Sequence, residues 1–495
     1  MSNYEHTIIA RQDTSISQIK QIKEKYSDLI LKNKGNIVQT QEWGLMNLSY
    51  LIKKNKKGNY IHFKIECDGS LIRKLEKNSG RPISILTDLQ GPKLRVGSFQ
   101  NSEGVILKTN SNFVLDLSKE KGSEERVSFP HPELYEHLKI GQNSYINDGH
   151  LKLKITENKN NKINTKVISP GKITNNKGVN LPDLKFTLPA ITEKDESDIE
   201  FALKNNVDWI ALSFVQHAND ILNLKKRIDG KASVIAKLEK PSALKDLDNI
   251  IKVADGIMIA RGDLGIEVPL ETVPVLQKKI IRNCRRSAKP SIVATQMLES
   301  MITSPIPTRA ESSDVATAVY DGADAVMLSA ETAIGRFPLR TVETMNRIIS
   351  EVENDAHYSN IIDLNYKKED INSSDAIVIA AKGISSMASI KAIVTYTTSG
   401  STTYRLAKQR PPSPILSITP SKSVARQSCL VWGVHSVINE EKIPETKIAE
   451  ESAKIAIREK IAEVDDQLII TAGIPFGTVG STNSIRLIKI NKEYG

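Results

Sequence analysis

SVIAKLEKP (residues 233–241), ADGIMIA (254–260) and PSIVATQ (290–296) are the stretches that decide the fold. Each is a short apolar run that ends in polar residues, and each is followed by residues with the apolar spacing of a helix. Strands that alternate with helices lie parallel, and polar strand ends are typical of a (β/α)8 barrel with its site at that edge. The sequence therefore predicts such a barrel over residues 183–353.

A further barrel strand is predicted in RPISILTDLQGPK, at residues 81–93. Ile83, Ile85 and Leu86 have the character of buried-strand residues, and Gly-Pro follows as a turn. Asp88 comes at the end of this strand, which is where functional groups collect in a parallel α/β protein.

The other parts of the chain have different patterns. Short alternating strands such as GVILKT and NFVLDL, punctuated by glycine and asparagine, predict an all-β insertion. KAIVTYT and QLIITAG predict strands of a C-terminal α/β unit beyond a polar linker. The predicted organisation is a β-α-β-β-α segment (1–78), a catalytic barrel (80–97 and 183–353), an inserted β-barrel domain (98–182), a linker (354–373) and a C-terminal α/β domain (374–495).

The N-terminal segment predicts an α+β, ferredoxin-like fold that lacks its last strand. A helix is expected at 14–33, with Gly35 as its C-cap. Two strands follow, joined by a lysine-rich turn at 53–58, and then a short helix, DGSLIRKLEKN. The expected apolar stripe of the first helix consists of Ile16, Ile19, Ile22, Tyr26, Leu29 and Ile30.

Composition narrows the class of protein. The 495 residues are 39% hydrophobic and 25% charged, which is ordinary for a soluble globular protein. No apolar run approaches the ~18 residues of a membrane span, and no signal-peptide pattern is found. Three distant cysteines form no disulfide framework, which favours a reducing cytoplasm.

Residues 1–80 hold 14 of the basic and 8 of the acidic residues. This indicates either a polyanion partner such as RNA or a solvated lysine-rich surface.

Three charged residues at predicted strand ends carry the chemistry. Lys237 and Glu239 are two residues apart, so they point to the same side of their strand. Asp263 ends the next strand, and two carboxylates with room for water and substrate suit Mg²⁺. Lys237 is then a fixed cation for developing negative charge. A structural salt bridge among the three side chains is the alternative.

Two further groups extend this predicted site. RGDLG opens a helix, so the amides of Gly262 and Asp263 can hold a substrate carboxylate, and Thr295 adds a hydroxyl one strand further on. In the C-terminal domain a hydroxyl-rich turn lies between a strand and a helix, where it can cradle a phosphate. Ordinary helix capping is the alternative for this turn. Its residues are Thr397, Thr398, Ser399, Gly400, Ser401 and Thr402.

Long motifs in the barrel resemble the pyruvate kinase family. They include IAKLEKP, IARGDLGIEVPLE, PSIVATQMLESM, PTRAESSDVATAVYDGADAVMLSAETAIGRFP and NNKGVNLPD, and the resemblance covers residues 80–495. It implies transfer of a phosphoryl group from phosphoenolpyruvate to ADP, in a homotetramer, with a sugar-phosphate effector at the C-terminal turn. The fold that it implies is a (β/α)8 barrel with an inserted β domain and a C-terminal α/β domain.

The resemblance also implies roles for single residues. Glu239 and Asp263 bind Mg²⁺, and Lys237 stabilises the phosphoryl group in transfer. The substrate carboxylate is bound by Gly262, Asp263 and Thr295. Arg95 and Lys177 contact the nucleotide. Thr295, Ser329 and Glu331 order a water that protonates the enolate.

A monovalent-cation site is implied at Asp88 and the Leu89 carbonyl. Family members that depend on K⁺ have glutamate at position 93, and Lys93 resembles the K⁺-independent kind. The Lys93 ammonium is expected to take the place of the cation, so no K⁺ requirement is predicted.

The first 80 residues depart from this family. Its Arg-x-Asn-x-Ser-His-Gly motif, which supplies a substrate-binding arginine, is absent from them. Instead, NYEHTIIARQD and TQEWGLMNLSYLIKKNKKGNYIHFKIE resemble the small-subunit ribosomal protein S6 family over residues 2–77. That family binds ribosomal RNA, although Met46 stands where a basic residue is usual.

Two families are therefore joined, and each is truncated at the seam. The barrel is expected to lack its first two strands, which leaves open edges. We expect a pyruvate kinase-type phosphotransferase of low or no activity, since a cationic group is lost. The alternatives are a ribosome- or RNA-associated binding protein with a vestigial kinase part, and a non-functional gene fusion.

Overall fold

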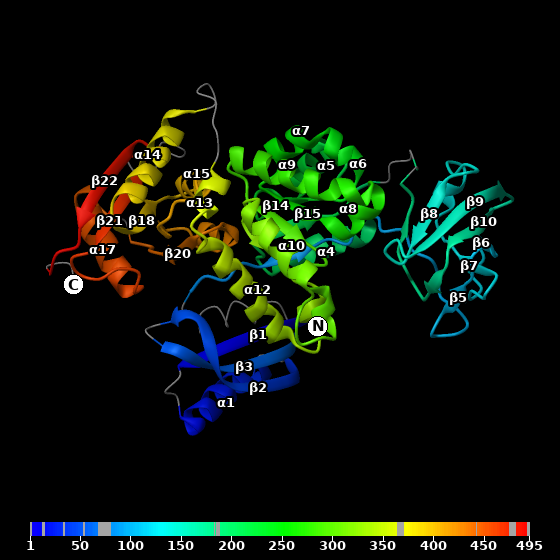
Figure 1. Cartoon of the computed structure of the whole chain (residues 1–495), viewed down its shortest axis with the longest axis horizontal. Coiled ribbons are helices and arrows are strands. Elements are labelled where there is room, and N and C mark those ends of the chain that lie inside the picture. Colours follow the sequence, from blue (N-terminus) through cyan, green and yellow to red (C-terminus); the bar gives the residue numbers. More distant parts are fainter. Residues whose placement is uncertain are drawn as a thin grey trace. The chain divides into compact units, whose positions relative to one another are not determined.

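The computed structural model describes residues 2–11, 15–32, 35–52, 55–67, 81–182, 184, 189–363, 371–441, 443–474 and 482–492. They belong to two compact units, Leu86–Gln296 and a unit that combines Met1–Ile85 with Met297–Gly495. Figure 1 labels the elements, and each unit is described by itself.

The Leu86–Gln296 unit is built on a parallel half-barrel sheet. Its strand order is β16-β15-β14-β13-β4. The interior strands are buried along their whole length or nearly so, which explains their continuous apolar runs. The predicted parallel α/β fold is confirmed. The strands are β4 (Leu86–Asp88), β13 (Trp209–Leu212), β14 (Ser233–Leu238), β15 (Gly256–Ala260) and β16 (Ser291–Ala294).

Helices follow these strands in the order that the sequence predicts. Thr192 begins the first of them with a capping box, in which its hydroxyl accepts the Asp195 amide and the Asp195 carboxylate accepts the Thr192 amide. The helices are α4 (Glu193–Lys204), α5 (Ala218–Ile228), α6 (Pro241–Lys245), α7 (Leu247–Val253), α8 (Arg261–Glu267), the 3-10 turn η1 (Leu270–Thr272) and α9 (Val273–Arg286).

The β4 strand is shorter and less buried than predicted. It begins at Leu86 instead of near Ile83, and Ile83, Ile85 and Leu86 are only half-buried. The reason is its position, because β4 is an edge strand with β13 as its neighbour, and among the described strands none pairs with its other edge. Within the described residues this edge is therefore open, as predicted from the two missing strands.

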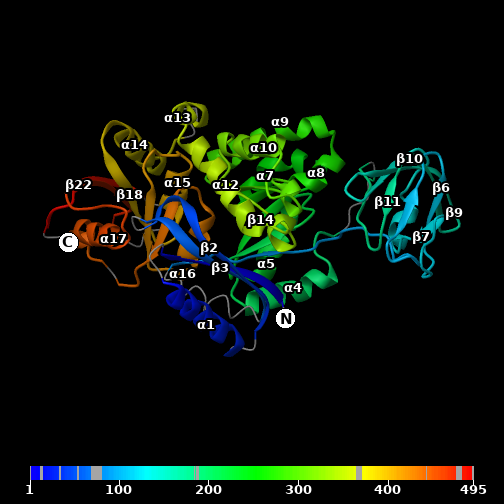
Figure 2. The ribbon, with the colours of Figure 1, turned by 60° about the horizontal axis from the view of Figure 1, so that its bottom comes forward.

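The inserted region is all-β apart from one short helix, as predicted (Figure 2). Six strands form a sheet in the order β12-β8-β9-β10-β6-β7, and β11 pairs with β5. Phe113, Phe129 and Leu153 lie in its core. Its elements are β5 (Val105–Leu107), β6 (Asn112–Asp116), β7 (Arg126–Ser128), α3 (Pro132–Tyr135), β8 (Asn143–Ile146), β9 (Leu151–Lys159), β10 (Lys162–Ser169), β11 (Gly171–Ile173) and β12 (Val179–Asn180).

The N-terminal segment forms an antiparallel sheet of its own, in the order β1-β3-β2. Helix α1 (Ile16–Lys32) buries Tyr26 and Ile30, but Ile16 of the predicted stripe is 88% exposed because it stands in the first turn. The Gly35 amide donates to the Ile30 carbonyl, as expected of a C-cap. The strands are β1 (Ser2–Arg11), β2 (Asn36–Ile52) and β3 (Asn55–Cys67).

Two predictions for this segment need comment. Residues 55–58 of the turn predicted at 53–58 belong instead to β3, which begins at Asn55. The helix predicted in DGSLIRKLEKN lies outside the described residues.

The rest of this unit contains the last barrel elements and the C-terminal domain. The predicted linker at 354–373 includes a helix, α13, since Tyr358 and Ile362 are apolar enough to pack and are buried. The barrel elements are η2 (Glu299–Ile302), α10 (Arg309–Tyr320), β17 (Ala325–Val326), α11 (Ala330–Ala333), α12 (Pro338–Glu353) and α13 (Tyr358–Ile362).

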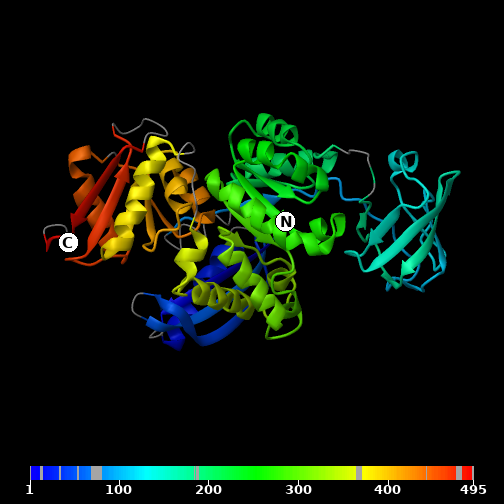
Figure 3. The same cartoon turned by 45° about the horizontal axis from the view of Figure 1, so that its top comes forward.

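The C-terminal domain is a sheet in the order β20-β19-β18-β21-β22, with helices on both faces (Figure 3). Val394 packs with α17 on one face, and Ile393 packs with α14 and α15 on the other. Its strands are β18 (Ile390–Tyr396), β19 (Ile415–Thr419), β20 (Val434–Ile438), β21 (Gln467–Ala472) and β22 (Ser484–Lys489). Its helices are α14 (Ser373–Met387), α15 (Ser401–Ala407), α16 (Lys422–Gln427), η4 (Ser428–Leu430), η5 (Glu445–Lys447) and α17 (Ile448–Arg458).

Candidate functional site

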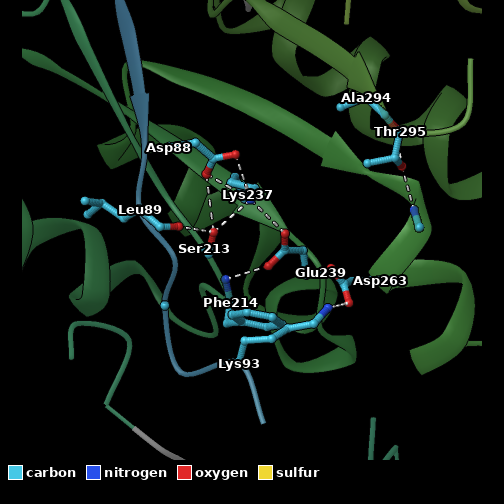
Figure 4. A network of polar contacts seen from close by, with 12 residues as sticks. Asp88, Leu89, Lys93, Ser213, Phe214, Lys237, Glu239, Asp263, Ala294 and Thr295 are labelled. Carbon is cyan, nitrogen blue, oxygen red and sulfur yellow. Dashed lines mark hydrogen bonds and ion pairs between the residues drawn. The ribbon is translucent and has the colours of Figure 1, made fainter. Parts of the chain in front are cut away.

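Lys237 is the centre of a polar network at the carboxyl ends of three adjacent strands (Figure 4). Its Nζ lies 3.0 Å from Asp88 Oδ1 and 3.2 Å from Glu239 Oε1, and it donates to Ser213 Oγ at 2.8 Å. Asp88 ends β4, Ser213 follows β13, and Lys237 and Glu239 come from the end of β14. The parallel register thus gathers one cation, two carboxylates and a hydroxyl from distant parts of the sequence.

The Lys237 ammonium stays charged in this setting. Its side chain is only 12% exposed, and burial alone would lower its pKa. The charges of Glu239 and Asp88 outweigh burial and raise the pKa of Lys237 above its ordinary value. A buried lysine with a raised pKa is a fixed positive charge.

Glu239 is almost completely buried, with 2% of its side chain exposed. Its Oε2 accepts the Phe214 amide at 2.7 Å, and Phe214 has a φ of 54°. Burial raises the pKa of Glu239, and the Asp263 charge adds to this while Lys237 opposes it. The left-handed backbone at Phe214 is the kind of local strain that is retained at functional sites.

Asp263 lies in the first turn of α8 and forms an ion pair with Lys93. Both side chains are largely buried, and the Lys93 ammonium is 5.5 Å from the centre of the Phe214 ring. Lys93 was predicted to take the cation's place at Asp88. The structure instead pairs Lys93 with Asp263, and it is Lys237 that binds Asp88.

The segments around Thr295 and Gly262 are tied to one another. Thr295 Oγ1 accepts the Gly262 amide at 2.7 Å and donates to the Ala294 carbonyl at 2.6 Å. Thr295 has a φ of 70°, so its backbone is in the left-handed region. The Gly262 amide predicted to hold a carboxylate is therefore engaged by Thr295, and substrate would have to compete with that hydroxyl.

Ser329 and Glu331 belong to the other unit and are described within it. Glu331 is buried, and its carboxylate accepts the Ser329 amide at 2.7 Å and the Leu298 amide at 3.2 Å. These bonds hold the loop after β17 against the segment that leads to η2. In this unit Glu331 therefore holds the backbone at Ser329 and at Leu298 in place.

Arg95 and Lys177, the predicted nucleotide residues, lie on neighbouring segments at the base of the insertion. Arg95 forms a β-bridge with Gly178, and the Val96 amide donates to the Lys177 carbonyl at 3.0 Å. The exposed Arg95 guanidinium donates to the Asn176 carbonyl at 2.9 Å. The structure therefore brings these two residues together.

The hydroxyl-rich turn of the C-terminal domain is partly engaged in internal bonds. Thr397 Oγ1 accepts the Gly400 amide at 2.9 Å, and Gly400 needs its φ of 81° for the turn. Thr402 is hydrogen-bonded to Thr482 at 2.7 Å. Thr398 and Ser399 are exposed and Ser401 is half-buried.

Glu239 and Asp263 fit a magnesium ion by the chemistry of their donors. Both are carboxylates, and the charge of Asp263 acts on Glu239. Within the described residues no group of three or more His, Cys, Asp or Glu side chains is arranged to hold a metal. Two carboxylates that leave positions for water and substrate are what Mg²⁺ prefers over a closed protein cage.

Two functional contacts in this network are absent from the sequence prediction. The Ser213 hydroxyl donates to the Leu89 carbonyl at 2.6 Å and accepts from Lys237, and the Phe214 amide fixes Glu239. Both residues lie near the end of the stretch DWIALSFV, at positions 213 and 214. The rule that selected Asp88, a polar residue at a strand end, could also have selected Ser213.

A half-barrel of parallel strands, with an inserted β domain and a cluster of lysine and carboxylate side chains near the strand ends, defines the class of barrel enzymes whose site lies at the carboxyl ends of the strands. Residues 55–342 match the pyruvate kinase barrel domain, and residues 375–488 match the pyruvate kinase alpha/beta domain. The chain belongs to the pyruvate kinase family. Residues 3–87 match ribosomal protein S6, so the two matches overlap at the seam.

Curated relatives agree with this assignment. A pyruvate kinase of Methylorubrum extorquens is 48% identical over 424 residues, which cover 86% of this chain and 88% of the relative. One from Agrobacterium vitis is 44% identical over 84% of this chain and 88% of its own length. One from Geobacillus stearothermophilus is 37% identical over 91% and 77%. In the described part of the chain, no helix combines the length and apolar character that crossing a membrane requires.

Proposed function

We propose that this chain transfers a phosphoryl group from phosphoenolpyruvate to ADP, the last step of glycolysis. The observation that carries the proposal is the Lys237 ammonium, held by Glu239 and Asp88 at the carboxyl ends of adjacent parallel strands. A charged, largely buried lysine beside metal-binding carboxylates suits a reaction in which positioning and charge neutralisation supply most of the catalysis.

Each residue of the site has its own role in the phosphoryl transfer. Lys237 offers its charge to the phosphoryl group in transfer, and Ser213 and Asp88 orient it. Gly262 and its neighbours in α8, together with Thr295 after β16, receive the substrate carboxylate. Arg95 and Lys177 contact the nucleotide. By family resemblance we also assign delivery of a proton to the enolate carbon to Thr295 and, described separately in the other unit, to Ser329 and Glu331. Mg²⁺ held by Glu239 and Asp263 would neutralise charge on the phosphate oxygens.

We also propose that the reaction needs no K⁺. The carboxylate of Asp88 already carries a lysine ammonium as its counter-ion, which leaves little need for a monovalent cation. The test is an assay in buffer free of K⁺ and Na⁺, and strict dependence on added K⁺ would contradict it.

The turnover is expected to be low, because residues 1–80 lack the substrate-binding arginine of the family. Loss of one such cationic group costs about 10²–10³ in rate. A lactate-dehydrogenase-coupled assay, with Lys237→Met as the blank, tests both points. Turnover equal to that of the M. extorquens relative would refute the impairment. Pyruvate formation that is undetectable, or equal in the blank, would refute the kinase function itself.

The match to ribosomal protein S6 supports a second, separate role for the N-terminal segment, contact with ribosomal RNA. Its sheet of β1, β2 and β3 is consistent with that fold. Co-sedimentation with small ribosomal subunits is the test, and its outcome is independent of the kinase assay. By family resemblance we further propose a cytoplasmic homotetramer with a sugar-phosphate effector at residues 397–402.

A further inference from the structure

A buried carboxylate outside the predicted site joins the inserted domain to the barrel. Glu267 is the last residue of α8, and 2% of its side chain is exposed. Its Oε1 accepts the Lys240 ammonium at 2.7 Å and the Asn180 side-chain amide at 3.0 Å. Asn180 is in β12 of the insertion, and Lys240 is the N-cap residue of α6, two residues after the end of β14. One oxygen atom therefore binds two segments to α8.

Each of these three residues is close in sequence to a residue of the proposed site. Lys240 adjoins Glu239, and Glu267 is about one helical turn after Asp263 on the same helix. Asn180 is on the segment that carries Lys177. The contact therefore connects the segments of both metal-binding carboxylates with a nucleotide segment.

Packing around this contact supports the same connection. Helix α8 lies against β12, and a methyl group built on Gly149 of the insertion would lie 3.6 Å from Ile266 Cγ1. A cavity of about 540 Å³ adjoins it, with Lys93 and Phe214 in its wall together with Asn180, Lys240 and Glu267. The Lys240 ammonium is also 5.8 Å from the centre of the Phe214 ring.

We propose that Lys240, Glu267 and Asn180 are positioning residues that hold the inserted domain, and with it Lys177, against the barrel edge that carries Glu239 and Asp263. The Glu267 carboxylate is almost completely buried and is shared by a cation and an amide, so loss of either partner is costly. The role in catalysis rests on the proposed function, whereas the mechanical role does not.

The test is hydrogen exchange of the full chain, followed by nucleotide binding. In Glu267→Gln and Lys240→Met, exchange in residues 176–182 and 261–267 should be faster by roughly fivefold or more, because local opening becomes easier. Lys240→Arg should restore protection to within about twofold, since it keeps the ion pair. The control is Arg227→Met, which removes the Arg227–Glu196 ion pair of the same unit, and it should leave these segments unchanged.

The second readout is titration with ADP and Mg²⁺, which needs no turnover. The two disruptive variants should bind ADP several-fold more weakly, and Lys240→Arg should bind it normally. If Glu267→Gln fails to fold, Asn180→Ala decides the matter, because it leaves the Lys240–Glu267 pair in place. Unchanged exchange at 176–182 in all folded variants would overturn the proposal, whether or not the chain proves to be a kinase.

Discussion

Lys93 forms an ion pair with Asp263, one of the two carboxylates that fit magnesium. The pair is largely buried, so water screens it little. Because the Lys93 ammonium already pairs with the Asp263 carboxylate, Mg²⁺ must compete with it to bind there. The first prediction follows from that competition.

Replacing Lys93 with methionine should strengthen Mg²⁺ binding by about tenfold, since a close like charge is removed. Isothermal titration of the free protein with MgCl₂ measures this directly. Lys194→Met is the matched control, because that lysine pairs with Asp198 on the surface of α4. Equal or weaker Mg²⁺ affinity in Lys93→Met would show that Lys93 does not compete with Mg²⁺ for Asp263.

Gly178 provides room for the Lys93 side chain. A methyl group at this glycine would lie 2.9 Å from Lys93 Cε, which is too close. Gly178→Ala should therefore displace Lys93 and raise Mg²⁺ affinity in the same direction as Lys93→Met, and by less. In the double variant the alanine should add nothing. Gly383→Ala is the control, as a methyl group there has nothing within 4 Å.

Arg410 should be among the most costly side chains to replace. Its guanidinium is fully buried, binds Asp324 at 3.1 Å and the Gly322 carbonyl at 2.6 Å, and lies 4.9 Å from the Trp432 ring. Arg410→Met should lower the free energy of unfolding by about 3–5 kcal/mol, because the buried Asp324 carboxylate loses the guanidinium with which it pairs. Urea denaturation measures this.

Two further variants make this prediction specific. Adding Asp324→Asn to Arg410→Met should recover part of the loss. Arg458→Met, at a side chain that is 61% exposed, should change stability by no more than about 0.5 kcal/mol. A loss of similar size in Arg458→Met would contradict the assignment to burial.

Glu311 should make stability depend on pH in the acid range. Burial on its own would raise its pKa, but bonds from Ser300 and Thr308 hold the pKa of Glu311 below its ordinary value of 4.5. A depressed folded-state pKa contributes stability that is complete above 4.5 and is lost as pH falls through the folded value. Wild type and Glu311→Gln should therefore differ at pH 7 and converge in acid, by urea denaturation. A difference between the two proteins that stays constant from pH 7 into acid would contradict this prediction.

Much of the fold follows from local sequence. The interior strands of the barrel are continuous apolar runs, and Asp88 and Lys237 lie at strand ends as predicted, whereas Asp263 lies in the first turn of α8, after β15. Such patterns span a few residues, so the sequence displays them directly. The weak predictions were at edges: among the described strands β4 has one neighbour, and Ile16 is 88% exposed.

The sequence by itself thus determined the alternation of strands and helices, the family and the residue types of the site. Only the tertiary structure decided which cation meets which carboxylate. It pairs Lys93 with Asp263, Lys237 with Asp88, and Glu267 with both Lys240 and Asn180. These partners are far apart in the chain, and their choice depends on strand register and on the reach of long side chains, which local patterns do not encode.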